Sequence, residues 1–280
     1  MQFETLAIVG VGLLGGSLGL AAKARGLVGR VVGFGRDPAK LATALELGAI
    51  DEAHAEFADA IPDADLVVVC TPVDLIPRHV REAADLASPG CILTDVGSTK
   101  ARIVAEVGNR LPAHVAFVGS HPMAGSEKKG PGHAVADLFV NRATIVTPTA
   151  DSDPNAVERL RRFWEGVGSR VVTMSPEEHD RAVANVSHLP HAVAAALAGT
   201  VDPAYLPVSA GGFRDTTRIA AAAPAIWEPI FRTNRAEVLA GCARFAARFE
   251  EFRKLLEADD GPGLIRWLNE GKKVRDALGS

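Results

Sequence analysis

The sequence contains few cysteines and no cluster of positive charge. Its 280 residues include three cysteines, Cys70, Cys91 and Cys242, which are odd in number and far apart. Cys70 and Cys91 lie in apolar runs, so we expect buried free thiols in a reducing compartment and no disulfide framework. The net charge is -4, and the lysines and arginines are spread along the chain. This pattern argues against nucleic acid or an anionic membrane as a partner.

The chain also lacks an uninterrupted hydrophobic segment. The apolar stretch from Leu6 to Ala22 contains five glycines and is preceded by Glu4. It is too short and too rich in glycine to span a bilayer, and neither a basic region nor a cleavage site flanks it. We therefore expect a cytoplasmic protein. The apolar share of 48% and the charged share of 23% are those of a globular chain with one large or two ordinary domains.

A glycine-rich motif follows the first predicted strand. Residues 6–9 are predicted to form a buried strand, and a helix is predicted to end near Arg25. Glycines at this spacing permit a tight turn, close approach of a pyrophosphate to the backbone, and close packing of helix on strand. The motif lies between strand and helix, so it predicts dinucleotide binding. The predicted contacts are Gly10, Gly12, Leu13, Leu14 and Gly15.

The end of the second predicted strand, residues 30–34, bears on the choice of cofactor. Enzymes that use NAD carry an acidic residue about 20 positions after the glycines, where it binds the ribose 2′-hydroxyl. Here Gly35 occupies that place and Arg36 follows, a guanidinium suited to a 2′-phosphate. Asp37-Pro38 fits the N-cap and first position of the next helix better than a ribose contact. The sequence therefore favours NADP and leaves NAD open.

Strands and helices continue to alternate along the chain. Further strands are predicted at residues 65–70, 91–94, 114–118, 143–148 and 170–173, with helices at residues 75–86, 100–110 and 154–167. This alternation predicts an α/β Rossmann domain over residues 1–174, with a mostly parallel, doubly wound sheet. Ligands of such sheets collect at the carboxyl ends of the strands. Thr71, Pro72 and Ser98 are therefore expected along one crevice. Ser98 is also a natural N-cap, and a cap alone is as consistent with the sequence as a cap that contacts substrate.

The stretch Gly119-Ser120-His121-Pro122-Met123-Ala124-Gly125-Ser126-Glu127 follows the strand predicted at residues 114–118. An imidazole has an unperturbed pKa near 6.5, which suits proton transfer near neutral pH. His121 is therefore a candidate acid or base. Taken alone, the stretch fits a turn rich in glycine and proline at least as well. The lysines at 128 and 129 fit a solvated loop better than a substrate contact.

The pattern changes at Ser175-Pro176-Glu177-Glu178, a capping box with proline at the first helical position. Nearly everything after it is predicted to be helical, so we place a domain boundary here and expect an all-α domain over residues 175–280. Amphipathic helices at residues 226–241 and 243–256, and a last helix with Leu264, Trp267 and Leu268, carry much apolar surface. This predicts a twofold dimer.

Three histidines, His179, His188 and His191, lie on the helix that begins at Pro176. At about 100° per residue, His179 and His188 fall on opposite faces of a straight helix, so no metal site is expected. Pro190 removes a backbone hydrogen bond and is expected to kink the helix.

A second block of interest is Gly211-Gly212-Phe213-Arg214-Asp215-Thr216-Thr217-Arg218. Asp215 and Arg218 are three residues apart on one helical face. Arginine is suited to grip a carboxylate at two points, although an ordinary surface pair is the alternative.

Five blocks together resemble the prephenate/arogenate dehydrogenase family of tyrosine biosynthesis. They are residues 8–17, Asp95–Lys100, Gly119–Gly125, Ser187–His191 and Gly211–Arg218. The likeness extends from about residue 5 to residue 255. It implies a Rossmann domain, a helical dimerisation domain and a site between them. It also implies a homodimer that oxidatively decarboxylates prephenate to 4-hydroxyphenylpyruvate, or arogenate to tyrosine, with hydride transfer to NAD(P).

The resemblance also implies roles for individual residues. By motif match, His121 accepts a hydrogen bond from the ring C4 hydroxyl of the substrate, and Ser98 orients that hydroxyl. Arg218 binds a substrate carboxylate, and His191 lines the same pocket. The other predicted substrate contacts are Ser126, Arg214 and two acidic partners of Arg218, Glu127 and Asp215. Gly35-Arg36 departs from the family pattern, because members that use NAD carry an acidic residue there.

Two other functions remain open from the sequence. A dehydrogenase of the β-hydroxyacid type shares the Rossmann start and the helical second domain, but uses a lysine on the long helix. The helix from Pro176 has no lysine before Gly199, which counts against this function. The second alternative is a protein that senses NADP without turnover, which predicts nucleotide binding but no organised second site.

Overall fold

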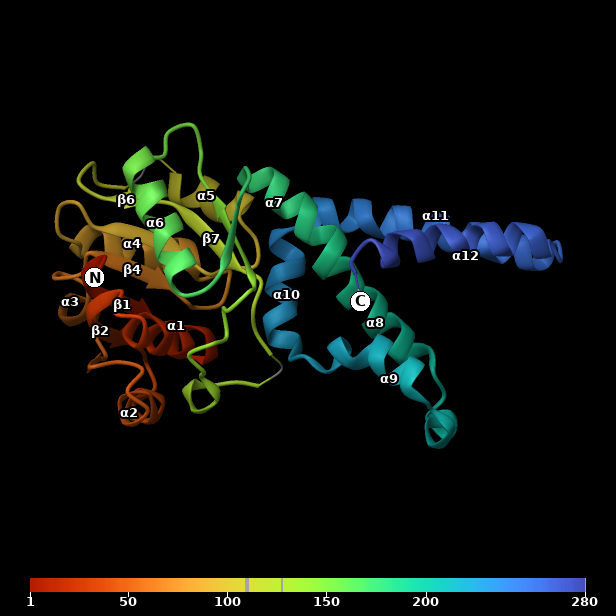
Figure 1. Cartoon of the computed structure of the whole chain (residues 1–280), viewed down its shortest axis with the longest axis horizontal. Coiled ribbons are helices and arrows are strands. Elements are labelled where there is room, and N and C mark those ends of the chain that lie inside the picture. The colour runs from red at the N-terminus through yellow and green to blue at the C-terminus, as the bar shows by residue number, and fades with distance from the viewer. Residues whose placement is uncertain (109–110, 127, 280) are drawn as a thin grey trace. The chain divides into compact units, whose positions relative to one another are not determined.

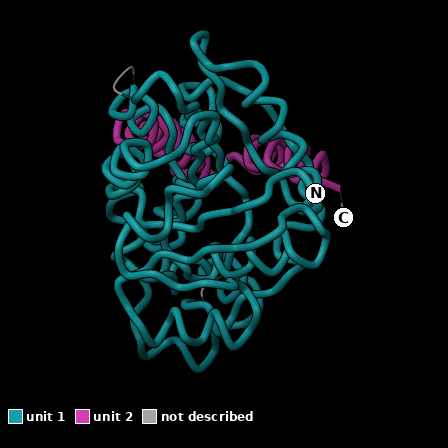
Figure 2. Tube along the Cα trace, turned by 90° about the vertical axis from the view of Figure 1, so that its left-hand side faces the viewer, with its two compact units in different colours: residues 1–234 teal, residues 235–280 magenta. Residues whose placement is uncertain are grey.

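The computed structural model describes residues 1–108, 111–126 and 128–279. Glu127, one of the predicted substrate contacts, lies outside the described residues. By their internal contacts the described residues form two compact units, 1–234 and 235–280 (Figure 2). The first unit thus holds the predicted nucleotide-binding segment together with the helices up to residue 234. The domain boundary at residue 175 stays a prediction.

Six strands of the described chain, in the segment coloured red to yellow in Figure 1, form a parallel sheet. Their order in the sheet is β3-β2-β1-β4-β5-β6. They are β1 (Phe3–Val9), β2 (Val28–Phe34), β3 (Glu52–His54), β4 (Leu66–Val69), β5 (Ile92–Asp95) and β6 (Ala116–Phe117). The strand order reverses between β1 and β4, which is the position where doubly wound sheets bind dinucleotides. The predicted Rossmann-type fold is confirmed.

Helices cover both faces of this sheet because its strands are apolar on both sides. Leu6 and Ile8 of β1 pack in one core cluster with α1 and α6, while Ala7 and Val9 pack in the other with α4 and α5. The helices of this part are α1 (Leu13–Ala24), α2 (Pro38–Glu46), α3 (Phe57–Ala60), α4 (Ile76–Leu86), α5 (Ala101–Val107) and α6 (Pro154–Gly166). Of the three free cysteines, Cys91 is buried, whereas Cys70, which we expected to be buried, is only partly so.

A second, smaller sheet begins at residue 119, where the sequence taken alone fitted a turn. It consists of β7 (Gly119–Pro122), β8 (Ala143–Thr147) and β9 (Arg170–Thr173), with β7 antiparallel to β8 and β8 parallel to β9. The strand predicted at residues 114–118 is only the short β6. The next strand, β7, pairs with β8 through the backbone of residues 119–122, although these residues include a glycine and a proline. His121 therefore projects from a strand opposite Ile145.

The segment after Ser175 is helical, as predicted. Its capping box is confirmed, because Ser175 Oγ accepts from the Glu178 N–H at 3.1 Å and Glu178 Oε2 accepts from the Ser175 N–H at 3.0 Å. The elements up to residue 234 are α7 (Pro176–Val183), the π-helix η3 (Ala184–His188), α8 (Leu189–Thr200), η4 (Pro203–Val208), α9 (Gly211–Thr217), η5 (Arg218–Ala221) and α10 (Pro224–Thr233). Pro190, which we expected to kink a continuous helix, instead lies in the first turn of α8, and the irregularity is the π-helical turn that ends at His188.

The second unit consists of α11 (Arg235–Glu257) and α12 (Gly261–Asp276). The helix predicted over residues 226–241 is wrong, because it is interrupted at Asn234 between α10 and α11. The Asn234 side chain instead donates to the backbone carbonyl of Asp180 at 2.7 Å. In the described part of the chain, no helix combines the length and apolar character that a bilayer span requires.

Candidate active site

A cavity of about 770 Å³ lies at the carboxyl ends of β1, β2 and β4. Six of the predicted cofactor contacts line it: Gly10, Gly12, Gly35, Arg36, Thr71 and Pro72. The other three, Leu13, Leu14 and Gly15, belong to the first turn of α1 and are not among its lining residues. The cavity therefore brings together the glycine motif and the end of the second strand.

The backbone of the glycine motif fits a dinucleotide. Gly10 has a φ of +96°, a conformation that other residues rarely adopt. A Cβ on Gly15 would lie 2.6 Å from the Gly10 carbonyl oxygen and 2.8 Å from Ile8 Cγ2, so only glycine allows this packing. No side chain caps the first amides of α1 at Gly12. Such uncapped amides form an anion site suited to a pyrophosphate.

Arg36 and Lys40, which follow β2, line the cavity together with Arg78, Lys129 and three acidic side chains. Asp37 is already engaged as the N-cap of α2, where it accepts from the Ala39 N–H at 3.1 Å and pairs with Lys40 Nζ at 3.1 Å. The hydrogen bonds from Lys40 hold the pKa of Asp37 below its usual value. This carboxylate is thus committed to the helix.

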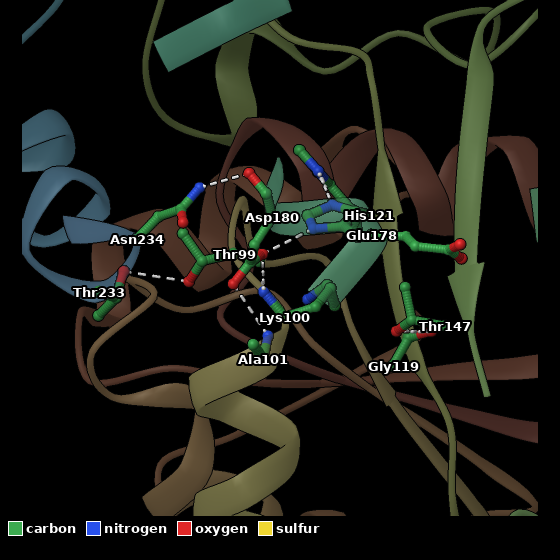
Figure 3. A network of polar contacts seen from close by, with 12 residues as sticks. Thr99, Lys100, Ala101, Gly119, His121, Thr147, Glu178, Asp180, Thr233 and Asn234 are labelled. Atoms are coloured by element: carbon green, nitrogen blue, oxygen red, sulfur yellow. Dashed lines mark hydrogen bonds and ion pairs between the residues drawn. The ribbon is translucent and has the colours of Figure 1, made fainter. Parts of the chain in front are cut away.

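A chain of hydrogen bonds connects His121 to a buried carboxylate on α7 (Figure 3). His121 Nδ1 lies 2.8 Å from His179 Nε2, and His179 Nδ1 lies 2.8 Å from Asp180 Oδ1. His179 is fully buried, Asp180 is 3% exposed and His121 is 7% exposed. The chain resembles the acid–histidine arrangement that orients a catalytic imidazole, extended by a second ring.

The donors and acceptors of this chain determine which nitrogen of His121 carries the proton. An ionised Asp180 accepts from Nδ1–H of His179, so the neutral His179 ring presents Nε2 as an acceptor. His121 must then donate from Nδ1–H, which leaves a lone pair on its Nε2. Within the described part of the chain, Nε2 has no hydrogen-bond partner. His121 is therefore arranged to accept a proton at Nε2.

The surroundings keep both rings neutral. Burial and the neighbouring His179, Lys100 and His188 lower the pKa of His121 well below its usual value. Burial and the charge of Lys100 lower the pKa of His179 to about 2. A neutral imidazole is the form that acts as a base.

The N-terminus of α5 is capped by Asp180 and not by Ser98, so the predicted cap is wrong. The Asp180 carboxylate accepts from the backbone N–H of Lys100 at 2.7 Å and of Ala101 at 3.0 Å. α5 begins at Ala101, and no side chain from the preceding residues caps it. Ser98 is partly buried, and its backbone hydrogen-bonds the His188 ring. Its hydroxyl is thus not committed to the helix.

His188, the last residue of the π-helical turn, and His191, in α8, both have ring contacts with Trp227. Asn234 Nδ2 donates to His188 Nδ1 at 3.2 Å, and burial lowers the pKa of His188 to about 4. His191 stacks on Trp227 with ring centroids 3.5 Å apart and is 5% exposed. Its Nδ1 is buried without a hydrogen-bond partner in the described structure. A buried polar atom without a partner is costly, and a ligand group is one way to satisfy it.

Four predicted substrate contacts lie elsewhere on the surface of the first unit. Arg218 begins η5, so it follows the end of α9, and both elements pack against α8. Arg214, Asp215 and Arg218 are exposed, and the described residues contain no ion pair between Asp215 and Arg218. Ser126 is exposed and accepts from the Lys128 N–H at 3.2 Å. The structure thus places Arg218 beside the helix of His191, without a direct contact to His121.

Sequence reasoning missed His179 and Asp180 as partners of His121. A helical wheel relates the three histidines only to one another and not to residues outside their helix. The contact between His121 and His179 spans 58 residues and joins two separate elements. Only the adjacent His-Asp pair on a capped helix could have suggested it. In the described residues, no group of three or more potential ligand side chains is arranged to hold a metal.

Comparisons with known proteins identify the family. The prephenate dehydrogenase nucleotide-binding domain matches residues 18–173, and the prephenate dehydrogenase dimerization domain matches residues 175–270. The prephenate dehydrogenase of Bacillus subtilis is 36% identical over 98% of this chain and 76% of its own length. The cyclohexadienyl dehydrogenase of Zymomonas mobilis is 35% identical over 99% of this chain and 96% of its own length.

Solved structures agree with these relatives. The prephenate dehydrogenase of A. aeolicus, in complex with hydroxyphenyl propionate and NAD+, has a TM-score of 0.90 at 33% identity and covers 98% of both chains. The 3-hydroxyisobutyrate dehydrogenase of Salmonella typhimurium has a TM-score of 0.60 at 17% identity, which shows a common fold alone. The chain therefore belongs to the prephenate dehydrogenase family.

Proposed function

We propose that this chain is an NAD(P)-dependent dehydrogenase that oxidatively decarboxylates prephenate or arogenate, with His121 as the proton acceptor. The observation that carries this assignment is the hydrogen-bonded chain Asp180–His179–His121, which leaves Nε2 of a neutral His121 free. A protein that only senses NADP has no use for such an arrangement. A β-hydroxyacid dehydrogenase would need a lysine on α7 or α8, and neither helix contains one.

The proposed reaction requires a base and accurate orientation. Nε2 of His121 accepts the proton of the ring C4 hydroxyl as the C4 oxygen becomes a carbonyl. When bound, the nicotinamide accepts the hydride that leaves C4. Loss of carbon dioxide from C1 then makes the ring aromatic, so the overall step is strongly favourable. The protein supplies position and proton transfer, and the latter is typically worth about 10²–10⁴-fold in rate.

The substrate's acidic groups need partners on the helical side of the site. We assign the uncommitted hydroxyl of Ser98 to the C4 oxygen, and the unpartnered Nδ1 of His191 to a polar group of the substrate. Arg218 would bind a carboxylate from η5, which packs against the helix of His191. Ser126, Glu127, Arg214 and Asp215 complete the proposed substrate contacts.

NADP is the cofactor that the cavity favours. Arg36 follows Gly35 at the end of β2 and lines the cavity with other cations, while Asp37 is held as a helix cap. A guanidinium binds a 2′-phosphate well, and no acidic side chain free to bind a ribose follows β2 directly. The other proposed contacts, from Gly10 to Pro72, are shared by both cofactors.

The enzyme is proposed to act as a homodimer through its C-terminal helices. The dimerization-domain match supports this assembly. So do the exposed apolar side chains of α11 and α12.

The direct test is to follow reduced-cofactor absorbance with NADP or NAD and three substrates in turn: prephenate, arogenate and 3-hydroxyisobutyrate. We expect turnover with at least one cyclohexadienyl acid and none with 3-hydroxyisobutyrate. His121→Asn should lower kcat by about 10²–10⁴-fold with little change in cofactor affinity. Turnover of 3-hydroxyisobutyrate alone, or of nothing, would refute the proposal. Equal loss of kcat and cofactor affinity in His121→Asn would make His121 a structural residue.

A further inference from the structure

A fully buried ion pair lies directly beside β7, the strand that carries His121. Lys100 Nζ contacts the Asp95 carboxylate, and neither side chain is exposed to solvent. The same carboxylate accepts from the Gly97 N–H at 2.8 Å and from the Ser120 N–H at 3.3 Å. Ser120 is the neighbour of His121 on β7. The Asp95 carboxylate is therefore fixed from three sides and holds the backbone next to the base.

Lys100 connects this carboxylate to a second one. Its side chain binds Asp95, while its backbone N–H donates to Asp180 at 2.7 Å (Figure 3). Its aliphatic stem lies against β7, because a Cβ added to Gly119 would be 3.2 Å from Lys100 Cδ. One residue thus links the end of β5, the start of α5, and the carboxylate that orients His179.

These contacts form a closed ring. It begins at the Ser120 N–H, passes through Asp95, Lys100, Asp180 and His179, and returns to β7 at His121 Nδ1. At one end of the network Asp95 binds the backbone N–H of Ser120, and at the other end His179 binds the side chain of the next residue, His121. Such a closed network of satisfied buried groups fixes a unique geometry, because each member constrains the next.

We propose that Lys100, together with Asp95, is a positioning residue that orients His121 through this ring. This inference rests on the proposed role of His121 as the base. It assigns to Lys100 a function separate from any substrate or cofactor contact. Neither Lys100 nor Asp95 lines the cofactor cavity.

The charges around His121 set the direction of the effect. His179 and Asp180 face it from α7, His188 from the π-helical turn, and Lys100 with Asp95 from the β5–α5 connection. Besides burial, the charge of Lys100 lowers the pKa of both His121 and His179. Removing the ammonium should therefore raise the pKa of His121, and the acid limb of the kcat profile should move to higher pH.

The test uses Lys100→Met, which keeps the stem and removes the charge. The first readout needs neither cofactor nor substrate: ring resonances of labelled histidines are followed by NMR as pH falls, and His121 is identified by its loss in His121→Asn. We expect His121 in the wild-type protein to stay neutral well below the pH at which a free imidazole titrates, and to titrate at a measurably higher pH in Lys100→Met. The acid limb of kcat should shift in the same direction, with kcat lowered by about tenfold or more.

Two further variants separate positioning from folding. The double variant Asp95→Asn with Lys100→Met removes both charges, avoids an unpaired buried carboxylate, and should shift His121 in the same direction. Thr147→Val is the matched control. Thr147 Oγ1 donates to the carbonyl of Gly119, on the strand of His121, at 3.1 Å, but Thr147 is not part of the ring. It should lower the melting temperature without moving the profile.

The outcomes are distinct. An unmoved His121 titration in folded Lys100→Met or in the double variant would overturn the inference. So would an equal shift in Thr147→Val, because it would show a general loosening of β7. Failure of the wild-type protein to oxidise either cyclohexadienyl acid would refute the proposed function instead. The NMR titration would still measure the effect of Lys100 on His121.

Discussion

The protonation state of His121 is set by neighbouring side chains that lie far away in the sequence. His121 is an ordinary imidazole until His179 and Asp180 select its Nδ1–H tautomer. A reversed tautomer would direct N–H at the substrate hydroxyl and leave no acceptor for its proton. The same selectivity by a buried carboxylate is what makes acid–histidine pairs effective in other enzymes.

At Arg36, the expected change is one of cofactor preference. Arg36→Asp replaces the cation at the end of β2 with an acceptor for the ribose 2′-hydroxyl and repels a 2′-phosphate. We expect the ratio of NADP to NAD affinity to fall by about 10-fold or more, which fluorescence titration without substrate can measure. Arg78→Asp is the matched comparison at the α4 wall of the cavity. An unchanged ratio in Arg36→Asp would mean that other side chains bind the 2′-phosphate.

Buried histidines should also make stability depend on pH. Burial holds the pKa of His179 near about 2 and of His188 near about 4, whereas both titrate near 6.5 when unfolded. Below about pH 6.5 these two histidines are therefore protonated in the unfolded chain but still neutral in the folded chain. The stability contributed by these rings is complete above about pH 6.5 and declines as pH falls, by up to about 1.4 kcal/mol per unit for each ring.

Urea unfolding between about pH 7 and pH 5.5 measures this slope, within the range where the histidines titrate on unfolding. His188→Asn removes one titrating ring and should give a shallower dependence than the wild-type protein. Identical slopes would show that His188 is protonated to the same extent in both states.

At the scale of elements, local signals were predictable from the sequence and distant ones were not. The capping box of Ser175 and the cap of Asp37 were both predicted correctly, because their hydrogen bonds join residues two or three positions apart. Ser98 had the same appearance as a cap, yet Asp180 occupies that role from 80 residues away. Hydroxyl and carboxylate compete for the same amides, and only tertiary packing decides between them.

The same limit explains the candidate site. Gly10, Gly12 and Arg36 line one cavity, as expected of residues that follow strands of one parallel sheet, whereas the rest of the glycine motif does not. That this cavity binds the cofactor stays a prediction. β7 was missed because residues 119–122 contain glycine and proline, and their partner β8 lies beyond a long connection. The ring through Lys100 has no signal in local sequence, because a lysine at the start of a helix is normally solvated.

The π-helical turn between α7 and α8 provides a test at this scale. A π-turn holds one residue more than the α-helical pattern, and Val186 in it is 72% exposed. Deleting Val186 should restore the α-pattern and rotate His188 and His191 by about 100° relative to His179. We expect kcat/KM to fall by about 100-fold or more, with cofactor affinity unchanged because the cavity is formed by earlier residues.

Val186→Ala serves as the control, since it keeps the turn and removes only exposed atoms. Kinetics with the preferred cyclohexadienyl acid and cofactor titration distinguish the two variants. Wild-type kcat/KM in the deletion variant would show that the π-turn has no part in placing the histidines.

At the scale of the whole molecule, the second unit has apolar surface that the described chain leaves exposed. α11 and α12 expose large apolar side chains, including Phe249 at 55%, Ile265 at 62% and Leu268 at 58%. Two helices of this size cannot form a substantial core alone. An apolar surface of this kind on a chain with a dimerization-domain match is most simply covered by a second copy.

Phe249→Glu tests this assembly by placing a charge in the apolar face. Burying an unpaired carboxylate is costly, so we expect the dimer to dissociate at least about 100-fold more readily. Sedimentation velocity across a concentration series measures the change. Leu47→Glu, at a 44% exposed position on α2's end in the first unit, is the control and should leave the mass unchanged. A wild-type dimer constant in Phe249→Glu would locate the interface elsewhere.

The cap that Asp180 provides for α5 has a consequence for how the protein is made. A ribosome adds about 5–20 residues per second, so the amides at the start of α5 emerge several seconds before the carboxylate that will bind them. Until then the nascent chain contains the complete glycine motif and His121, but not the two residues that select the Nδ1–H tautomer of that histidine. During synthesis, therefore, every residue that lines the nucleotide cavity emerges before the carboxylate that fixes the proton of His121.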